Sequence, residues 1–327
     1  MALRVLFIGG TGIISSACAD LAVARGLDLT VLNRGTGRRG LPDGVTALSA
    51  DVRDPAQVRE VLGDRTFDVV VDFVAFTPDH VAADVEQFRG RTGQYVFISS
   101  ASAYQKPVGH LPITESTPLH NPFWQYSRDK IACEDLLTKA YRDEGFPAVV
   151  VRPSHTYDRT LVPLDDGWTA VDRMRRGKPV VVHGDGTSTW VLTHHTDFAK
   201  GFVPLLGEPA VTGDTVHITG DEVLTWDQIA RTLGAAAGVP DPQLVHVPSD
   251  VIAREAPDRG PGLLGDKAHS VVFDNTKLKR LVPGFAATTS FAAGAREIVA
   301  HHDATPDLRV VDPDVDARQD RLVERFG

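Results

Sequence analysis

Short apolar runs alternate with helical patterns along the first half of the chain. Residues 67–76 are apolar at most positions, as in a strand that is buried on both faces. Strands that alternate with helices predict a parallel, doubly wound α/β sheet of the Rossmann type, covered on both faces. The expected strands are 5–8, 29–32, 46–48, 69–72, 95–98 and 148–151, and the expected helices are 13–25, 56–62, 78–89 and 125–142.

The pattern loosens after the Arg152-Pro153 pair, where Pro, Gly and His become frequent. We expect helices at 194–206, 226–237 and 318–326, and a mobile loop at 258–266, which reads DRGPGLLGD. The chain is therefore expected to form two parts. Residues 1–165 and 188–220 would make the sheet domain, and residues 166–187 and 221–327 a smaller α/β part.

Composition narrows the possible functions. The chain has 327 residues, 24% of them charged, and a net charge of −9, which argues against a surface that binds polyanions. Cys18 and Cys133 both fall in expected helices, which fits a reducing compartment rather than a disulfide framework. The N-terminus enters a strand directly, and no apolar run is long enough to span a bilayer. We expect a cytoplasmic location.

Residues 7–15 read FIGGTGIIS and stand between an expected strand and an expected helix. This order is a dinucleotide-binding signature. Gly9 allows a tight turn that a Cβ would obstruct, and Gly12 lets the backbone approach a pyrophosphate at the positive end of the helix. The third glycine of the usual pattern is replaced by Ser15. Glycine-rich turns also occur without a ligand, so the motif favours a nucleotide without proving one.

Tyr126 and Lys130 lie four residues apart in the segment YSRDK and share one face of the expected helix. An ammonium near a phenol favours the phenolate, so the pair suits acid–base work on an alcohol during hydride transfer. Ser99 and Ser100 follow a strand whose end faces the crevice of such a sheet, where a hydroxyl can donate to a substrate oxygen. Plainer explanations exist, because Y-x-x-x-K occurs by chance on exposed helices and small polar residues often end a strand.

Together these segments resemble the extended short-chain dehydrogenase/reductases, the group of NAD-dependent epimerases and dehydratases. The motifs follow in the family's order over nearly the whole chain: GGTGIIS, Asp51-Val52, VDFVAF, FISSASAY, YSRDK, VVRPSHTYD and GDGTSTWVLTHHTDFA. The resemblance implies that the first part binds a dinucleotide and the second a substrate, with Ser100, Tyr126 and Lys130 as catalytic residues. It places the cofactor along Gly9, Thr11, Gly12, Ile13, Ile14, Asn33, Arg34, Asp51, Val52, Phe73, Ala75, Ser99, Tyr126, Lys130, Pro153 and His155.

Departures from the family pattern bear on the substrate. The acidic pair that follows the serine in dehydratases is replaced by Ala101 and Ser102, which argues against sugar dehydration. The arginine that contacts the diphosphate of a nucleotide sugar is replaced by Trp190, which leaves such a substrate in doubt. The expected substrate contacts are Ser102, Trp124, Trp190 and His269.

The end of the second expected strand bears on the choice of cofactor. NAD-preferring relatives carry an acidic residue there for the ribose 2′-hydroxyl, whereas this chain has Asn33 and Arg34, with Arg38 and Arg39 nearby. Arg34 can pair with a 2′-phosphate, which slightly favours NADP. Alternatively Arg34 only stacks on adenine, and NAD binds nearly as well.

Neighbouring histidines at 194–195 and 301–302 do not predict a metal site. Adjacent residues on a helix point about 100° apart and seldom share one ion. No second cluster of ligand residues has metal-binding spacing. We therefore expect no metal, and we expect His301 and His302 to be solvated.

The leading hypothesis is an NAD(P)-dependent epimerase that acts on a sugar or sugar nucleotide through a transient ketone, with Tyr126 as acid and base. The alternative is a net NADP-dependent dehydrogenase or reductase of a sugar-like secondary alcohol. A redox-sensing or RNA-binding protein is the non-enzymatic alternative, since Asn33-Arg34-Gly35 also resembles a chloroplast RNA-binding branch of the family. We expect a homodimer with a small-molecule substrate, and neither a nucleic-acid nor a membrane partner.

Overall fold

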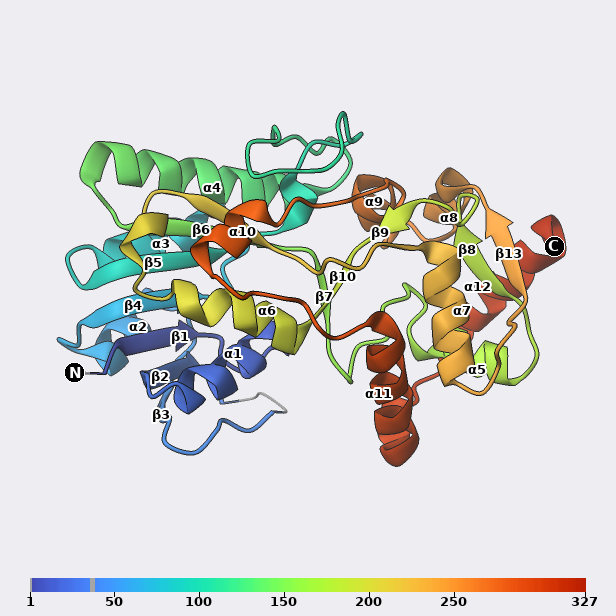
Figure 1. Cartoon of the computed structure of the whole chain (residues 1–327), viewed down its shortest axis with the longest axis horizontal. Helices are drawn as coiled ribbons and strands as arrows, with labels where there is room; N and C mark the ends of the chain where they lie inside the picture. The colour runs from blue at the N-terminus through green and yellow to red at the C-terminus, as the bar shows by residue number, and fades with distance from the viewer. Residues whose placement is uncertain (1, 36–38) are drawn as a thin grey trace.

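The computed structural model describes residues 2–35 and 39–327 and has two parts, drawn at the left and right of Figure 1. The first part is built on a seven-stranded parallel sheet with the order β11-β6-β5-β4-β1-β2-β3. The strand order reverses between β1 and β4, so a ligand crevice is expected beyond the carboxyl ends of these strands. The strands are β1 (Arg4–Ile8), β2 (Asp28–Asn33), β3 (Thr46–Ser49), β4 (Phe67–Asp72), β5 (Thr92–Ile98), β6 (Ala148–Pro153) and β11 (Thr215–Ile218).

Helices cover both faces of this sheet because its strands carry apolar residues on both faces. Val69 and Val71 of β4 lie in the core with α1 and α6, whereas Val70 lies in the core with α2, α3 and α4. This arrangement confirms the doubly wound α/β fold that the alternating pattern predicts. The helices of this part are α1 (Ile13–Ala24), α2 (Pro55–Leu62), α3 (Pro78–Phe88), α4 (Gln125–Glu144) and α6 (His195–Phe202).

The second part contains short strand pairs and helices around a core of its own. Trp168, Trp190 and Trp226 are buried in this core. The strand pairs are β7 (His155–Tyr157) with β10 (Leu192–His194), β8 (Val180–His183) with β13 (Leu244–Val247), and β9 (Thr189–Trp190) with β12 (Leu224–Thr225). The helices are α5 (Trp168–Arg175), α7 (Trp226–Ala236), α8 (Ser249–Glu255), α9 (Gly260–Gly262), α11 (Phe291–Ala304) and α12 (Pro313–Phe326).

One late segment returns to the sheet. Leu278 of α10 (Thr276–Leu281), Val282 and Phe285 are buried in the core shared with α1 and α6. Figure 1 shows α10 beside the sheet rather than with the helices of the second part. The expected division assigned 276–285 to the second part and the strand residues 155–157 and 189–194 to the first. We propose the same two parts with 276–285 moved to the sheet part and 155–157 and 189–194 moved to the second, because Tyr157, Trp190 and Leu192 are buried in the core of the second part.

Several expectations for the second half of the chain need correction. The expected loop at 258–266 is largely helical, with α9 followed by a π-helical turn, η4 (Leu263–Lys267). The expected helix at 194–206 divides into the end of β10, then α6 and a 3-10 turn, η2 (Val203–Leu205). The expected terminal helix begins earlier, at Pro313. His302 is buried, not solvated, and stacks on Trp168 with ring centroids 4.7 Å apart.

Within the described ranges, none of the helices combines the length and the apolar character that a bilayer crossing needs.

Candidate active site

The glycine turn after β1 has the backbone shape that its sequence predicts. Gly9 has a φ of +85°, and a Cβ at this position would lie 2.4 Å from Cγ1 of Val74. Gly12 caps the N-terminus of α1, and the nearest atom to a Cβ there is Oγ of Ser15 at 3.2 Å. Ser15 is buried and accepts a hydrogen bond from the Gly12 N–H at 2.7 Å. The serine at the third glycine position is therefore accommodated inside the turn.

A groove of about 530 Å³ runs along this turn; we call it the glycine groove. It combines a close backbone approach with a helix N-terminus, the two features that a pyrophosphate needs. A nicotinamide dinucleotide therefore fits the residues present. Phe76, Val74 and Arg53 also line the groove and were not expected from the sequence. The expected residues that line it are Gly9, Thr11, Gly12, Ile13, Ile14, Asn33, Arg34, Asp51, Val52 and Phe73.

The arginines beyond the second strand do not act as one group. Arg34 lies exposed at the glycine groove. Arg39 instead forms an ion pair with Asp158 and donates to Oγ1 of Thr160 at 2.7 Å, and it lines a separate hollow. It therefore does not join Arg34 at the groove, as its position in the sequence suggested. Arg38 lies outside the described residues.

A cavity of about 350 Å³ opens beside Tyr126; we call it the tyrosine cavity. Phe76 connects the two sites, because it lines the glycine groove and its ring centroid lies 6.4 Å from that of Tyr126. The cavity is lined by Ser100, Ala101, Ser102, Trp124, Tyr126, Pro153, Ser154, His155, Thr156, Trp190, Val191, Asp266, Lys267, Val271 and Phe273.

Ser100 stands at the end of β5 and begins the 3-10 turn η1 (Ala101–Ala103). Its Oγ accepts a hydrogen bond from the Ser102 N–H at 3.1 Å and lies 2.9 Å from Ser102 Oγ. Ser127 donates a hydrogen bond to Ser102 Oγ at 2.8 Å, so the Ser102 hydroxyl can in turn donate a hydrogen bond to Ser100 Oγ. This direction leaves the Ser100 proton free to be donated into the cavity.

Lys130 is buried in α4 one turn after Tyr126. Its ammonium donates to the carbonyl oxygens of Ala75 and Ile98, both at 2.7 Å, and lies 5.8 Å from the centroid of the Tyr126 ring. An ammonium has three N–H donors, so these contacts use two of them. Burial lowers the pKa of Lys130 to about 8, while the negative charge of Asp72 acts in the opposite direction.

Burial raises the pKa of the Tyr126 phenol to about 12, and the Ser100 hydroxyl acts in the opposite direction. The sequence predicted a phenol that a nearby ammonium makes more acidic. In the protein alone, the cost of burying a phenolate exceeds such stabilisation. Tyr126 is therefore protonated at neutral pH.

His155 and Trp190 are coupled in the wall of the tyrosine cavity. The indole N–H of Trp190 donates to Nδ1 of His155 at 3.1 Å. Burial lowers the pKa of His155 to about 3, so its imidazole is neutral. Because Nδ1 accepts, the remaining proton is on Nε2. His155 is therefore a neutral hydrogen-bond donor.

Three other expected residues lie away from the cavity surface. The Ser99 hydroxyl donates a hydrogen bond to the buried carboxylate of Glu134 at 2.5 Å. Ala75 is buried and offers its carbonyl oxygen to Lys130. His269 bonds through Nε2 to the carbonyl oxygen of Leu264 at 2.9 Å and does not line the tyrosine cavity.

The turn η4 brings two unexpected residues, Asp266 and Lys267, into the cavity wall. Asn121 holds this turn, because its amide donates to the carbonyl oxygens of Gly265 at 2.7 Å and Ser102 at 2.9 Å. A Cβ on Gly265 would lie 2.8 Å from Cβ of Trp124, so the turn packs closely against the start of α4. This role depends on contacts between segments far apart in the sequence, so local patterns do not predict it.

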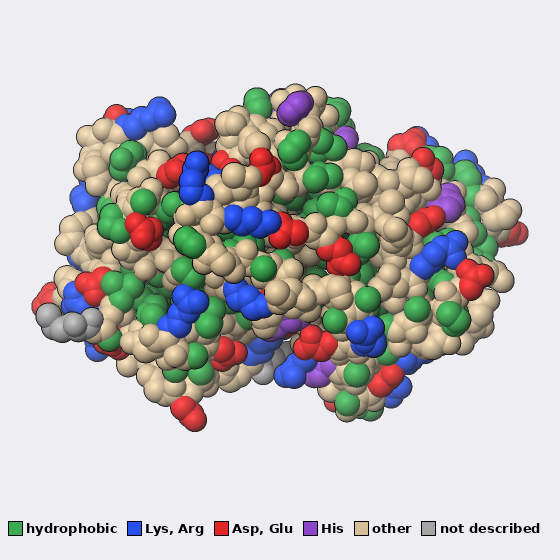
Figure 2. All heavy atoms as spheres, in the orientation of Figure 1, with side chains coloured by type: hydrophobic (Ala, Val, Ile, Leu, Met, Phe, Trp, Pro, Cys, Tyr) green, Lys and Arg blue, Asp and Glu red, His purple; other side chains and the backbone are tan. Residues whose placement is uncertain are grey.

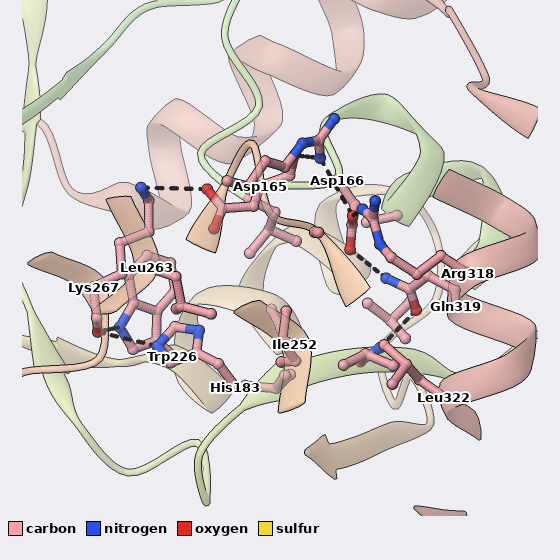
Figure 3. A pocket seen from close by; sticks show the side chains of 18 of the residues that line it. Asp165, Asp166, His183, Trp226, Ile252, Leu263, Lys267, Arg318, Gln319 and Leu322 are labelled. Atoms are coloured by element: carbon pink, nitrogen blue, oxygen red, sulfur yellow. Dashed lines mark hydrogen bonds and ion pairs between the residues drawn. The ribbon is translucent and has the colours of Figure 1, made fainter. Parts of the chain in front are cut away.

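A smaller cavity of about 60 Å³ lies beyond Lys267, which lines both spaces. Figure 3 shows the Lys267 ammonium directed at Asp165, 3.3 Å away, and the Lys267 carbonyl oxygen held by His183 and Trp226. On the other side Asp166 is bonded to Arg318 and Gln319 of α12. The side chain of Lys267 is therefore fixed between the two cavities.

Among the described residues, no group of three or more His, Cys, Asp or Glu side chains is arranged to hold a metal ion.

The known proteins that this chain resembles are named for different activities. The chain is 29% identical over 290 residues to 2'-dehydrokanamycin reductase of Streptomyces kanamyceticus, covering 86% of this chain and 80% of that one. It is 26% identical over 256 residues to a chloroplast stem-loop binding protein of Arabidopsis thaliana, covering 74% of this chain and 65% of that protein. The UDP-glucose 4-epimerase of Thermotoga maritima, solved with UDP-glucose, has the same fold, with a TM-score of 0.74 at 19% identity, covering 92% of this chain and 99% of that one.

Residues 5–218 match the family model described as the NAD dependent epimerase/dehydratase family. The match covers the glycine turn, the end of β5, the Tyr126 helix and the sheet through β11. This chain therefore belongs to the NAD-dependent epimerase/dehydratase family and is an NAD(P)-dependent enzyme of the short-chain dehydrogenase/reductase type.

Proposed function

We propose that this protein is an NAD(P)-dependent oxidoreductase that interconverts a secondary alcohol and a ketone in a sugar-like ring. The observation that carries the proposal is the meeting of the glycine groove and the tyrosine cavity at Phe76 and Tyr126. A bound nicotinamide cofactor supplies or accepts the hydride. The residues of this chain supply orientation and the proton.

Tyr126 is the proposed acid. Its pKa of about 12 keeps the phenol protonated at neutral pH, so it can protonate a ketone oxygen as that oxygen becomes a hydroxyl. The developing phenolate is stabilised by the Lys130 ammonium, 5.8 Å from the ring centroid. In the reverse direction Tyr126 returns to the phenol by taking the alcohol proton.

Ser100 and His155 are the proposed donors that orient the substrate oxygens. The Ser100 proton faces the cavity because the Ser102 hydroxyl can satisfy its acceptor side. His155 offers its Nε2 proton because Trp190 occupies Nδ1. Lys130 has one N–H donor beyond its two carbonyl partners, which suits a ribose hydroxyl of the cofactor.

Net oxidoreduction is preferred to epimerisation because the relative named as a reductase aligns over 86% of this chain, including most of the second part. Epimerisation is the second candidate. The same acid–base residue serves both reactions, and the cavity of about 350 Å³ is within the range of ligand pockets, roughly 300–1,000 Å³. The two reactions differ in whether the cofactor is consumed.

RNA binding ranks behind both reactions, although one relative is named as a stem-loop binding protein. Binding to a phosphate backbone needs clustered basic side chains. The net charge is −9, and Figure 2 shows Lys and Arg interspersed with Asp and Glu over the face it displays.

The test is oxidation of NADH or NADPH, followed by the absorbance of the reduced nicotinamide, in the presence of a panel of keto sugars and keto glycosides. We expect stoichiometric cofactor consumption with at least one ketone. Tyr126→Phe should lower kcat by about 10²- to 10⁴-fold, the usual contribution of a general acid, while the Kd for the cofactor stays unchanged. Near-normal turnover by this variant would refute the acid role, and inversion of a sugar without cofactor consumption would favour epimerisation.

A further inference from the structure

Asp266 presents a carboxylate to the tyrosine cavity with unused capacity to accept hydrogen bonds. Its charged partner is Lys106, whose Nζ lies 3.6 Å from Oδ1. No donor among the described residues forms a hydrogen bond to the other oxygen, Oδ2, although the side chain is only 19% exposed. A buried carboxylate that is balanced in charge but open as an acceptor suits a ligand with hydroxyl donors.

The positive charges around the cavity are already matched. The ammonium of Lys267 lies 3.3 Å from Asp165, and the side chain of Lys106 is fully buried behind Asp266. Among the described residues, Asp266 and Lys267 are the charged side chains in the cavity lining. A diphosphate placed here would lose its hydration without gaining an unpaired cation, and it would face the Asp266 charge.

The remaining walls suit the apolar face of a sugar ring. Trp124 lies beside Tyr126 with ring centroids 4.7 Å apart, and Trp190 directs its only polar atom at His155. Both tryptophans line the cavity together with the acceptor and donor groups described above. The negative charge of Asp266 also contributes to the raised pKa of Tyr126, so the two groups act on one another across the cavity.

We propose that Asp266 anchors the substrate by accepting hydrogen bonds from its hydroxyl groups, and that the cavity takes an unphosphorylated sugar-like ring rather than a nucleoside diphosphate sugar. The proposal rests on the proposed function, because Tyr126 defines where the reacting carbon lies. It adds a substrate class and an anchoring residue to that function.

The test measures binding rather than turnover, using the tryptophan fluorescence of the full chain loaded with NADP⁺. The probes are methyl α-D-glucopyranoside, methyl 2-amino-2-deoxy-α-D-glucopyranoside and UDP-glucose. We expect saturable binding of at least one glycoside, with a Kd at least about tenfold below that for UDP-glucose. Asp266→Ala should raise that Kd about 10- to 100-fold, as expected for loss of hydrogen bonds to a charged group.

Asp258→Ala is the matched control, because the Asp258 side chain lies nearby in the sequence but is 77% exposed. This variant should bind the glycosides like the wild type, and both variants should keep the Kd for NADP⁺. Tighter binding of UDP-glucose, no saturable binding of either glycoside, or an unchanged Kd in Asp266→Ala would overturn the proposal.

The design separates this proposal from the proposed function. Tyr126→Phe should still bind the glycosides saturably, because it keeps the ring in the cavity wall and loses one neutral hydrogen bond, which changes the Kd by less than about tenfold. If glycoside binding depends on Asp266 but no ketone consumes NADH or NADPH, the oxidoreductase proposal fails and the anchor stands. If turnover occurs but Asp266→Ala binds like the wild type, the anchor fails alone.

Discussion

Lys130 is a buried cation that two backbone carbonyl oxygens hold in place of a carboxylate. Its ring neighbours are Phe97 and Phe76, whose centroids lie 4.6 and 4.9 Å from Nζ. Carbonyl dipoles and aromatic faces stabilise an ammonium less than full hydration does, so the charged form remains costly. This environment explains why the pKa of Lys130 is lowered to about 8.

The lowered pKa of Lys130 predicts a pH dependence for ketone reduction. Lys130 is charged below about pH 8 and loses its proton as the pH rises through that value, far below the pKa of Tyr126 near 12. We expect log kcat/KM for NADH or NADPH to be constant below pH 8 and to fall with a slope of about −1 above it. A decline in log kcat/KM that begins only above about pH 10 would show that another group, not Lys130, controls it.

Arg34 is an exposed arginine that lines the glycine groove beside Asn33. If it pairs with a 2′-phosphate, Arg34→Ala should raise the Kd for NADP⁺ by about 10- to 100-fold, since hydrogen bonds to charged groups contribute roughly 1.5–3 kcal/mol. The Kd for NAD⁺ should change less than about threefold. Arg25→Ala, an exposed arginine outside the groove, is the control. Equal losses for both cofactors would instead indicate stacking on adenine.

At the scale of elements, the turn η4 shows how the second part completes the site. Its backbone is held by Asn121 through Gly265 and by His183 and Trp226 through the Lys267 carbonyl oxygen. These contacts order a glycine-rich segment that would otherwise be expected to move. The wall that carries Asp266 is therefore built from two elements distant in the sequence, α4 and η4.

Removal of the Asn121 side chain should release this turn. Asn121→Ala deletes the donor to two buried carbonyl oxygens, at Ser102 and Gly265, each of which costs about 1–3 kcal/mol when left unsatisfied. We expect a lower melting temperature and faster amide exchange in 260–267, measured by mass spectrometry. Gln125→Ala, at an exposed position of the same helix start, should leave exchange in this segment unchanged. Unchanged exchange in Asn121→Ala would contradict the role of Asn121.

The elements of the sheet could be predicted from the sequence because their apolar runs and glycine turn are local signals. Each expected strand of the sheet is present, and the expected first helix begins at Ile13 as predicted. β11 was not among the expected strands, because His217 interrupts its apolar pattern. The turn η4 was expected to be a mobile loop because its glycines and proline suggest a break, whereas tertiary contacts make it helical.

Some features of the candidate site could likewise be predicted from local sequence patterns, and others could not. The grouping of Tyr126 and Lys130 follows from helical spacing, and Ser100 follows from its place at a strand end. Asp266 depends on a contact with Lys106 of the other part, and the tautomer of His155 depends on Trp190, 35 residues later in the chain. No local pattern encodes such contacts, so they could not be predicted from one sequence.

For the whole molecule, we propose that a groove for the cofactor and a cavity for a sugar-like ring meet at Tyr126. The groove belongs to the sheet, and the cavity is closed by segments of the second part, including β9 and η4. Under the proposed function, this division lets the first part bind the dinucleotide while the second part selects the substrate. It also explains how one family accommodates different substrates on one sheet.

Transfer of deuterium tests this account most directly. The full chain is incubated with a turned-over ketone and with NADH or NADPH that carries deuterium at the transferred position, and the product is analysed by mass spectrometry and NMR. We expect one deuterium on the new carbinol carbon for each cofactor oxidised, and loss of this transfer in Tyr126→Phe. An alcohol product without deuterium, or an inverted sugar formed without cofactor oxidation, would contradict it.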